Sequence, residues 1–221
     1  RATQETTSAI LMAQLSEYLN KLETRKSIGF KKLDEAHVKS VWVQVNKAQI
    51  QNWKVTNPTV NRQIVKYLAR SEDFNGNLDK GIMLIGETGT GKTQMMKAVS
   101  LSMGFLQNFR FLIYSGLEME AIFREENEDS DKLESALKQK MFGIDDIGEE
   151  HSTVKVYGTE INVGVEILSK RYNEQMNTGA LTFATTNLTL DMLAKKYGKR
   201  IESRIHEMFN VIYLTGNDLR K

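Results

Sequence analysis

The octapeptide GETGTGKT at residues 86–93 constrains this chain more than any other feature. It matches the pattern G-x-x-x-x-G-K-[ST], in which a glycine-rich loop turns its backbone N–H groups toward phosphate oxygens. The loop directly follows the apolar run at 82–85. The stretch directly after it has apolar residues at helical spacing: Met95, Met96, Val99 and Met103. A phosphate-binding loop of this kind needs a strand before it and a helix after it. Because the sequence has both, it predicts a phosphate-binding site.

Each residue type in the loop has a physical role. The glycines permit backbone conformations that side-chain-bearing residues avoid. The helix that begins near Lys92 adds the partial positive charge of its N-terminus, and Lys92 itself reaches the β- and γ-phosphates. Thr93 offers its hydroxyl to Mg²⁺. The residues expected to bind the phosphates are Gly86, Glu87, Thr88, Gly89, Thr90, Gly91, Lys92, Thr93 and Gln94.

Two further apolar runs end in polar residues that suit the same chemistry. In FGIDDIG at 142–148, Asp145 would hold Mg²⁺ through water and Asp146 would polarise an attacking water. In ATTN at 184–187, Asn187 would place a neutral amide near the γ-phosphate. Because open α/β sheets bind ligands at the carboxyl ends of their strands, we expect all three elements to meet at one edge.

From residue 82 onward, short apolar runs alternate with longer helical stretches. This alternation predicts an α/β fold with a mainly parallel sheet, right-handed crossovers and helices on both faces. The expected strands are 82–85, 109–115, 140–145, 180–186 and 210–215.

The front of the chain is expected to be mainly helical. An amphipathic helix over residues 6–25 is indicated by Leu11, Leu15, Leu19 and Leu22. Residues 38–48 fit a helical stripe, although 41–45 also alternates like a strand, and we favour the helix. Asn57 is placed to cap a helix over 58–71 whose first residue is proline.

Composition excludes several classes of site. No cysteine is present, which rules out disulfides, thiolate zinc sites, iron–sulfur clusters and a cysteine nucleophile, and three histidines are too few for a histidine-rich metal site. No apolar run approaches the length of about 20 residues that is needed to span a bilayer. Residues 1–20 have polar residues where the apolar segment of a secretory signal would lie. We therefore expect a cytoplasmic protein without a membrane partner.

Several motifs in order resemble the AAA+ ATPases of the DnaC/IstB type, which are bacterial and phage helicase loaders and transposition ATPases. They are GETGTGKT, FGIDDIG, RY at 171–172, TTNL at 185–188, YGKRIESRI at 197–205 and LTGNDLR at 214–220. The resemblance covers about residues 56–221. It implies a P-loop NTPase domain over 56–221 with a five-stranded sheet and no C-terminal lid. Residues 1–55, which precede it, match no family motif and are expected to form a helical partner-binding segment, since loaders bind their helicase through the corresponding segment. Packing of its leucine stripe on the chain's own ATPase domain is an equal alternative.

The resemblance also implies an activity and partners. It implies a Mg²⁺-dependent ATPase that assembles as an ATP-dependent homo-oligomer and acts on a replicative helicase or a transposase at single-stranded DNA. An arginine of one subunit would reach the γ-phosphate held by the next, with Arg204 as the best match and Arg200 as the alternative. Asp146 stands where many AAA+ enzymes have glutamate, which allows slow hydrolysis or a switch read mainly through ATP binding. Arg220 matches the family's terminal arginine, without an assigned mechanism.

Charge limits where DNA would bind. Residues 118–131 hold seven Asp/Glu against one Arg, and this stretch would repel phosphates. We expect any DNA contact through Lys195, Lys196, Lys199 or the amino-terminal segment. Two other functions remain open on the sequence alone: a small P-loop kinase, and a binding module with ATP as a structural ligand.

Overall fold

The computed structural model describes residues 28–50, 57–125, 130–150, 153–156 and 159–216. The helix expected over residues 6–25 and the position of Arg220 lie outside these ranges. None of the described helices is long and apolar enough to cross a membrane. The helices are α2 (Glu35–Gln49), α3 (Pro58–Leu68), α4 (Lys92–Gln107), α5 (Gly116–Glu125), α6 (Ser130–Leu137), α7 (Val163–Thr178), α8 (Leu190–Tyr197) and α9 (Lys199–Met208).

The main sheet has five strands in the order β2-β3-β6-β1-β7, and every neighbouring pair is parallel. This confirms the predicted parallel α/β sheet. Since β6 lies between β1 and β3, the ends of these three strands are neighbours. The strands are β1 (Gly81–Ile85), β2 (Ile113–Ser115), β3 (Met141–Asp145), β6 (Leu181–Thr186) and β7 (Phe209–Tyr213).

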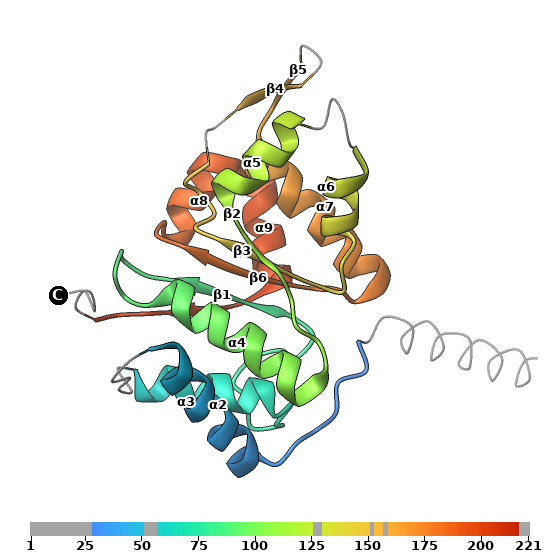
Figure 1. Cartoon of the computed structure of the whole chain (residues 1–221). Coiled ribbons are helices and arrows are strands. Elements are labelled where there is room, and N and C mark those ends of the chain that lie inside the picture. Colours follow the sequence, from blue (N-terminus) through green and yellow to red (C-terminus); the bar gives the residue numbers. More distant parts are fainter. Residues whose placement is uncertain (1–27, 51–56, 126–129, 151–152, 157–158, 217–221) are drawn as a thin grey trace, which may run out of the picture.

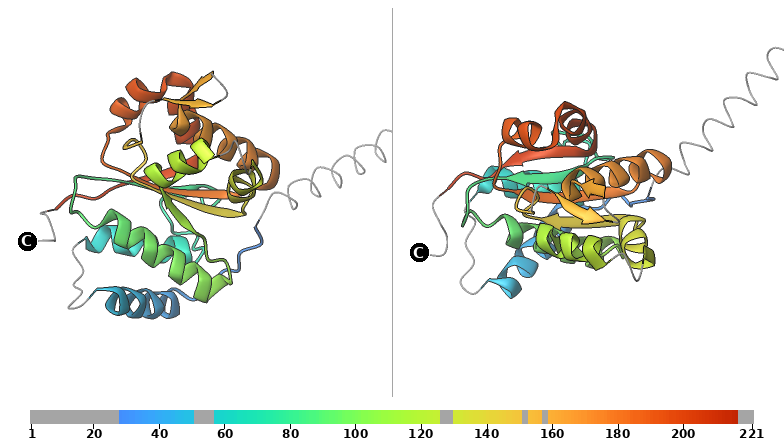
Figure 2. Two further views of the ribbon diagram at one scale, coloured as in Figure 1. Left: turned by 45° about the horizontal axis from the view of Figure 1, so that its top comes forward. Right: turned by 90° about the horizontal axis from the view of Figure 1, so that it is seen from above.

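Helices cover both faces of the sheet, as predicted. Side chains of a strand alternate between faces, so Ile82 and Leu84 pack with α2, α3 and α4, whereas Met83 and Ile85 pack with α5 to α9. Figure 1 shows the two helical layers below and above the sheet, and the left view of Figure 2 keeps α2 and α4 together on one side. Each layer therefore has its own hydrophobic core.

Helix α2 confirms the helical interpretation of residues 38–48, and the strand alternative at 41–45 is wrong. Val38 and Trp42, one helical turn apart, are buried in the core that α2 shares with α3 and α4. The Trp42 indole Nε1 donates to Asn61 Oδ1 of α3 at 2.7 Å. Residues 28–49 thus contribute to the core beneath the sheet, while a boundary near residue 56 stays a prediction.

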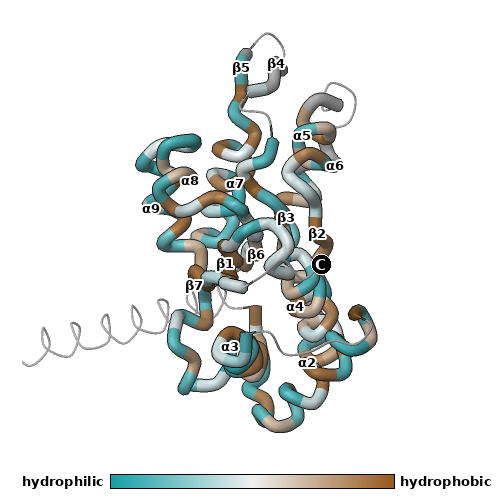
Figure 3. The backbone as a smooth tube through the Cα atoms, turned by 90° about the vertical axis from the view of Figure 1, so that its left-hand side faces the viewer, coloured by the Kyte–Doolittle hydropathy of each residue, from teal (hydrophilic) through white to brown (hydrophobic). Residues whose placement is uncertain are grey.

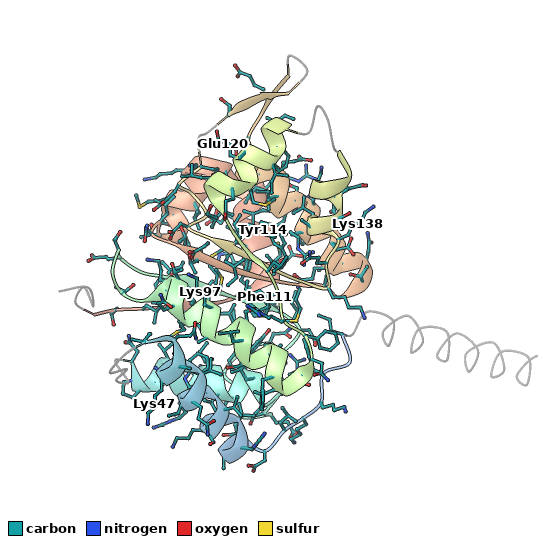
Figure 4. The ribbon with its side chains drawn as sticks, viewed as in Figure 1. Lys47, Lys97, Phe111, Tyr114, Glu120 and Lys138 are labelled. Atoms are coloured by element: carbon teal, nitrogen blue, oxygen red, sulfur yellow. The ribbon has the colours of Figure 1, made fainter. Side chains whose placement is uncertain are left out.

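The structure corrects two local expectations. Pro58 opens α3, but the Asn57 side chain makes no capping hydrogen bond. Strand β2 is shorter than the predicted 109–115, because Ser100 Oγ of α4 donates to the carbonyl of Phe111 at 2.6 Å and accepts from its N–H at 3.3 Å. The ring of Phe111, which is labelled in Figure 4, stacks on the ring of Phe183. The backbone of Phe111 is therefore bonded to a helix instead of a neighbouring strand.

A small antiparallel hairpin was not predicted. It pairs β4 (Val154–Val156) with β5 (Thr159–Ile161) and lies beyond α5 on the side away from the sheet (Figure 1). At the other end of the domain, no helix follows β7 among the described residues, which stop at residue 216.

Candidate nucleotide site

The predicted site elements meet at the carboxyl edge of the sheet. The phosphate loop connects β1 to α4, Asp145 ends β3, and Asn187 directly follows β6. Figure 3 is viewed from the side of Figure 1 on which the β1–α4 connection lies, and its labels run from β7 through β1, β6 and β3 to β2. The sheet order therefore places Asn187 between the phosphate loop and Asp145.

The glycines of the loop serve two purposes. Gly89 and Gly91 have φ angles of 86° and 87°, in the left-handed region that other residues avoid. Gly86 does not have a positive φ, but a Cβ there would lie 2.4 Å from the carbonyl oxygen of Leu214. Gly91 caps α4 without a side-chain hydrogen bond, so the first N–H groups of α4 have no side-chain cap. Such N–H groups at a helix N-terminus favour a bound anion.

Lys92 lies at the centre of the site. It is 5% exposed, and its Nζ donates to Asn187 Oδ1 at 2.5 Å and to the Glu87 carbonyl at 3.0 Å. The same Glu87 carbonyl accepts from the Thr90 hydroxyl at 2.8 Å, which closes the loop. The structure thus brings together two residues, Lys92 and Asn187, that the sequence assigned to the γ-phosphate.

The two residues expected to hold Mg²⁺ also lie together. The Thr93 hydroxyl donates to Asp145 Oδ1 at 3.1 Å, and the Thr185 hydroxyl donates to the same oxygen at 2.5 Å. These oxygen atoms are the ligand type that Mg²⁺ prefers. No group of three or more His, Asp or Glu among the described residues forms a metal site by itself. A Mg²⁺ ion at Thr93 and Asp145 would therefore complete its shell with phosphate oxygens and water.

Asp146 is held beside this pair in an unusual conformation. Its φ is 55°, and its N–H donates to Thr185 Oγ1 at 2.8 Å. Burial raises the pKa of the Asp146 carboxyl above its usual range, the negative charges of Asp145 and Glu149 raise it further, and Lys92 opposes them. A carboxylate with a raised pKa is a better proton acceptor, which suits the predicted role on water.

Sequence reasoning missed a set of residues that hold these groups. Glu149 is exposed, and its Oε1 accepts from Asn187 Nδ2 at 2.7 Å. Glu150 is 3% exposed; its Oε2 accepts from the Gly148 N–H at 2.8 Å and its Oε1 from the Tyr197 hydroxyl of α8. The signal available in the sequence was the pair of glutamates that directly follows IDDIG.

Lys196 lies inside this arrangement. Its Nζ donates to the carbonyl oxygens of Gly148 at 2.6 Å and Glu150 at 2.9 Å, so its ammonium is bound within the domain. Lys195 and Lys199 are exposed. A DNA contact through any of the three lysines stays a prediction, and Lys196 would first have to leave its internal partners.

The two candidate arginines of α9 differ in their contacts. Arg204 donates to Ser169 Oγ of α7 at 2.5 Å, and its guanidinium lies 4.9 Å from the ring centre of Tyr172. Arg200 is exposed and makes no hydrogen bond or salt bridge with the described residues. Arg204 is thus bound to α7 and not to the phosphate loop of its own chain.

Solved structures share this fold. The helicase loader DnaC matches with a TM-score of 0.58 and 21% identity over 79% of this chain and 98% of its own. DnaI matches with 0.58 and 22% identity over 79% and 92%. The replication initiator DnaA, bound to AMPPCP and single-stranded DNA, matches with 0.56 and 15% identity over 75% of this chain but 48% of its own. The TM-scores show a common fold, and at these sequence identities the matches show the fold alone.

A comparison with curated proteins found no match. The model of the ATPase family associated with various cellular activities (AAA) matches residues 82–209, a span that runs from β1 to the start of β7. It includes the phosphate loop, Asp145 and Asn187, which the structure places at one edge of a parallel sheet. Because this match covers more than half of the chain, the chain belongs to the AAA family.

Proposed function

We propose that this protein binds ATP with Mg²⁺ and hydrolyses it at the carboxyl edge of the sheet. The observation that carries the proposal is that the first two residues of α4 each meet a residue from another strand end: Lys92 contacts Asn187, which follows β6, and Thr93 contacts Asp145, which ends β3. The family implies a nucleotide, and these side chains supply a cation for the phosphates, oxygens for Mg²⁺ and an amide for the reacting end.

The residues divide the reaction among them. Lys92 and the N-terminus of α4 bind the phosphates, and Thr93 with Asp145 would hold Mg²⁺, which neutralises charge on the β- and γ-phosphates. Asp146 accepts a proton from the attacking water, and Asn187 orients that water without adding charge. Because aspartate is one methylene shorter than glutamate, we propose that turnover is slow.

Nucleotide binding is the first test. Lys92→Ala should abolish binding of a fluorescent ATP analogue, whereas Lys97→Ala, which removes an exposed charge from the same helix, should not change it. In the wild-type protein, Mg²⁺ and ATP should yield inorganic phosphate. Binding that survives Lys92→Ala would refute the proposal, and transfer of phosphate to a small acceptor would favour a kinase instead.

We propose further that hydrolysis needs two subunits, with an arginine of α9 reaching the ATP of its neighbour. Arg204 matches the family motif but would have to leave Ser169 and Tyr172, whereas Arg200 is already exposed. Mixing either arginine variant with Asp146→Asn should restore turnover only for the arginine that acts between subunits. Absence of rescue for both would refute a shared site.

The proposed partner is a replicative helicase at single-stranded DNA, with a transposase as the alternative. The support is the fold shared with DnaC, a helicase loader, and with DnaA, which was solved with single-stranded DNA. The Asp146→Asn protein should bind ATP without hydrolysing it, and in this ATP-bound state it should co-purify with the replicative helicase of its source organism. Co-purification with a transposase and without the helicase would assign it to transposition.

A further inference from the structure

The Asn187 amide bridges two opposite charges. Its Oδ1 accepts from Lys92 Nζ at 2.5 Å, and its Nδ2 donates to Glu149 Oε1 at 2.7 Å. An ammonium can only donate and a carboxylate can only accept, so the two partners fix which end of the amide faces the phosphate loop. That end is the oxygen.

The loop that carries Glu149 is fixed to β6 by its backbone. Ile147 N–H donates to the Thr185 carbonyl at 2.9 Å, and Glu149 N–H donates to the Asp146 carbonyl at 3.1 Å. Between them, Gly148 has a φ of 106° and passes so close to the segment after β6 that a Cβ would lie 2.6 Å from Leu188 Cδ1. Glu149 is therefore exposed to solvent but leaves from a well-supported backbone.

We propose that Glu149 is a positioning residue of the ATPase reaction, acting through the amide of Asn187. The inference rests on the hydrolysis proposed above. When ATP takes Lys92 as the partner of its phosphates, Asn187 Oδ1 loses its donor, while Nδ2 stays on Glu149. The amide then presents an acceptor to the attacking water, and not a donor to the γ-phosphate.

This role separates turnover from binding. The side chain of Glu149 accepts its hydrogen bond from Asn187, which lies outside the phosphate loop, so we expect its loss to leave ATP binding unchanged. Loss of the hydrogen bond frees the amide to rotate, and a misplaced orienting group lowers the rate of the chemical step by about 10- to 100-fold. The expected signature is a lower kcat with a KM that does not rise.

Two substitutions distinguish the hydrogen bond from the charge. Glu149→Ala removes both, and we expect kcat to fall about tenfold or more. Glu149→Gln removes the charge but keeps an oxygen that accepts from Asn187 Nδ2, so it should retain turnover within about threefold of wild type. Asp73→Ala removes an exposed carboxylate at the other end of the sheet and serves as the control.

A double-mutant cycle tests whether Glu149 acts through Asn187. In an Asn187→Ala background, Glu149→Ala should have no further effect on kcat, because the group that it positions is already absent. Additive losses would refute the positioning role, as would unchanged turnover in Glu149→Ala, a raised KM alone, or equal losses in the alanine and glutamine variants. A wild-type protein that binds ATP without turnover would instead refute the proposed hydrolysis, and this role with it.

Discussion

Replacing Arg171 with methionine tests how a buried guanidinium stabilises the sheet. Arg171 is fully buried, and its Nη1 donates to the carbonyls of Leu137 at 2.5 Å and Gln139 at 2.8 Å. Its Nη2 donates to the Leu181 carbonyl at 2.9 Å and its Nε to Thr182 Oγ1 at 3.0 Å. One side chain of α7 thus joins the end of α6 to the start of β6. Methionine replaces the aliphatic part of the arginine side chain but has no hydrogen-bond donor.

The cost follows from the acceptors that are left unpaired. A buried carbonyl without a donor costs about 1–3 kcal/mol; the Leu137 and Leu181 carbonyls are buried and that of Gln139 is partly buried, so the three cost about 3 kcal/mol at the lower end of that range. The lower end applies because methionine also removes a charge that is expensive to bury: burial lowers the pKa of Arg171 to about 10, which leaves it protonated at neutral pH. A loss of about 3 kcal/mol corresponds to roughly 6–12 °C in Tm for a domain of this size.

Thermal and urea unfolding of the full chain without nucleotide measure this loss. Arg62→Met, which replaces an exposed arginine of α3, is the control and should unfold as wild type does. Arg171→Lys should be destabilised as well, because one ammonium cannot reach acceptors that Nε, Nη1 and Nη2 contact separately. A Tm for Arg171→Met within about 2 °C of wild type would refute the reasoning.

Three further substitutions test other contacts. Thr185→Val removes the hydroxyl that donates to Asp145 and accepts from the N–H of Asp146. We expect turnover of this variant to need a higher Mg²⁺ concentration, measured as the Mg²⁺ dependence of phosphate release, and an unchanged dependence would contradict this. Tyr197→Phe leaves an oxygen of buried Glu150 without its hydroxyl donor and should cost about 1–3 kcal/mol in urea unfolding. Trp42→Ala should cost about 3–5 kcal/mol in urea unfolding, because the indole is buried in the core that α2 shares with α3 and α4, and a loss under about 1 kcal/mol would contradict this.

Features that depend on neighbours in the chain were predictable. An apolar run, a glycine-rich loop and a helical stripe follow one another over 82–103, and the structure has β1, the loop and α4 there. The same holds for Asp145 and Asn187, since each ends an apolar run, and parallel strands bring such ends to one edge. The resemblance added RY at 171–172, and the structure shows Arg171 inside the domain and Tyr172 under Arg204.

Features that depend on contacts between distant segments were not predictable. Phe109 and Phe111 alternate with Arg110 as the residues of a strand do, but Ser100 of α4 takes the hydrogen bonds of Phe111. Asn57 has the right residue type and position for a cap, yet its side chain makes no capping bond. Lys196 resembles its exposed neighbours in sequence, and only the approach of the Gly148 carbonyl explains why it is bound internally.

The same distinction explains which residues of the site were missed. The residues expected to meet ATP and Mg²⁺ come from the strand ends and the phosphate loop, where the local pattern is strong. Glu149 and Glu150 come from the connection after β3, which has no periodicity, and their partners Asn187 and Tyr197 lie on other segments. Because the strand order places β6 between β1 and β3, Asn187 is within reach of both Lys92 and the Glu149 loop. The amide of Asn187 therefore lies between the charges of Lys92 and Glu149, with a hydrogen bond to each, and a bound nucleotide would have to engage this amide.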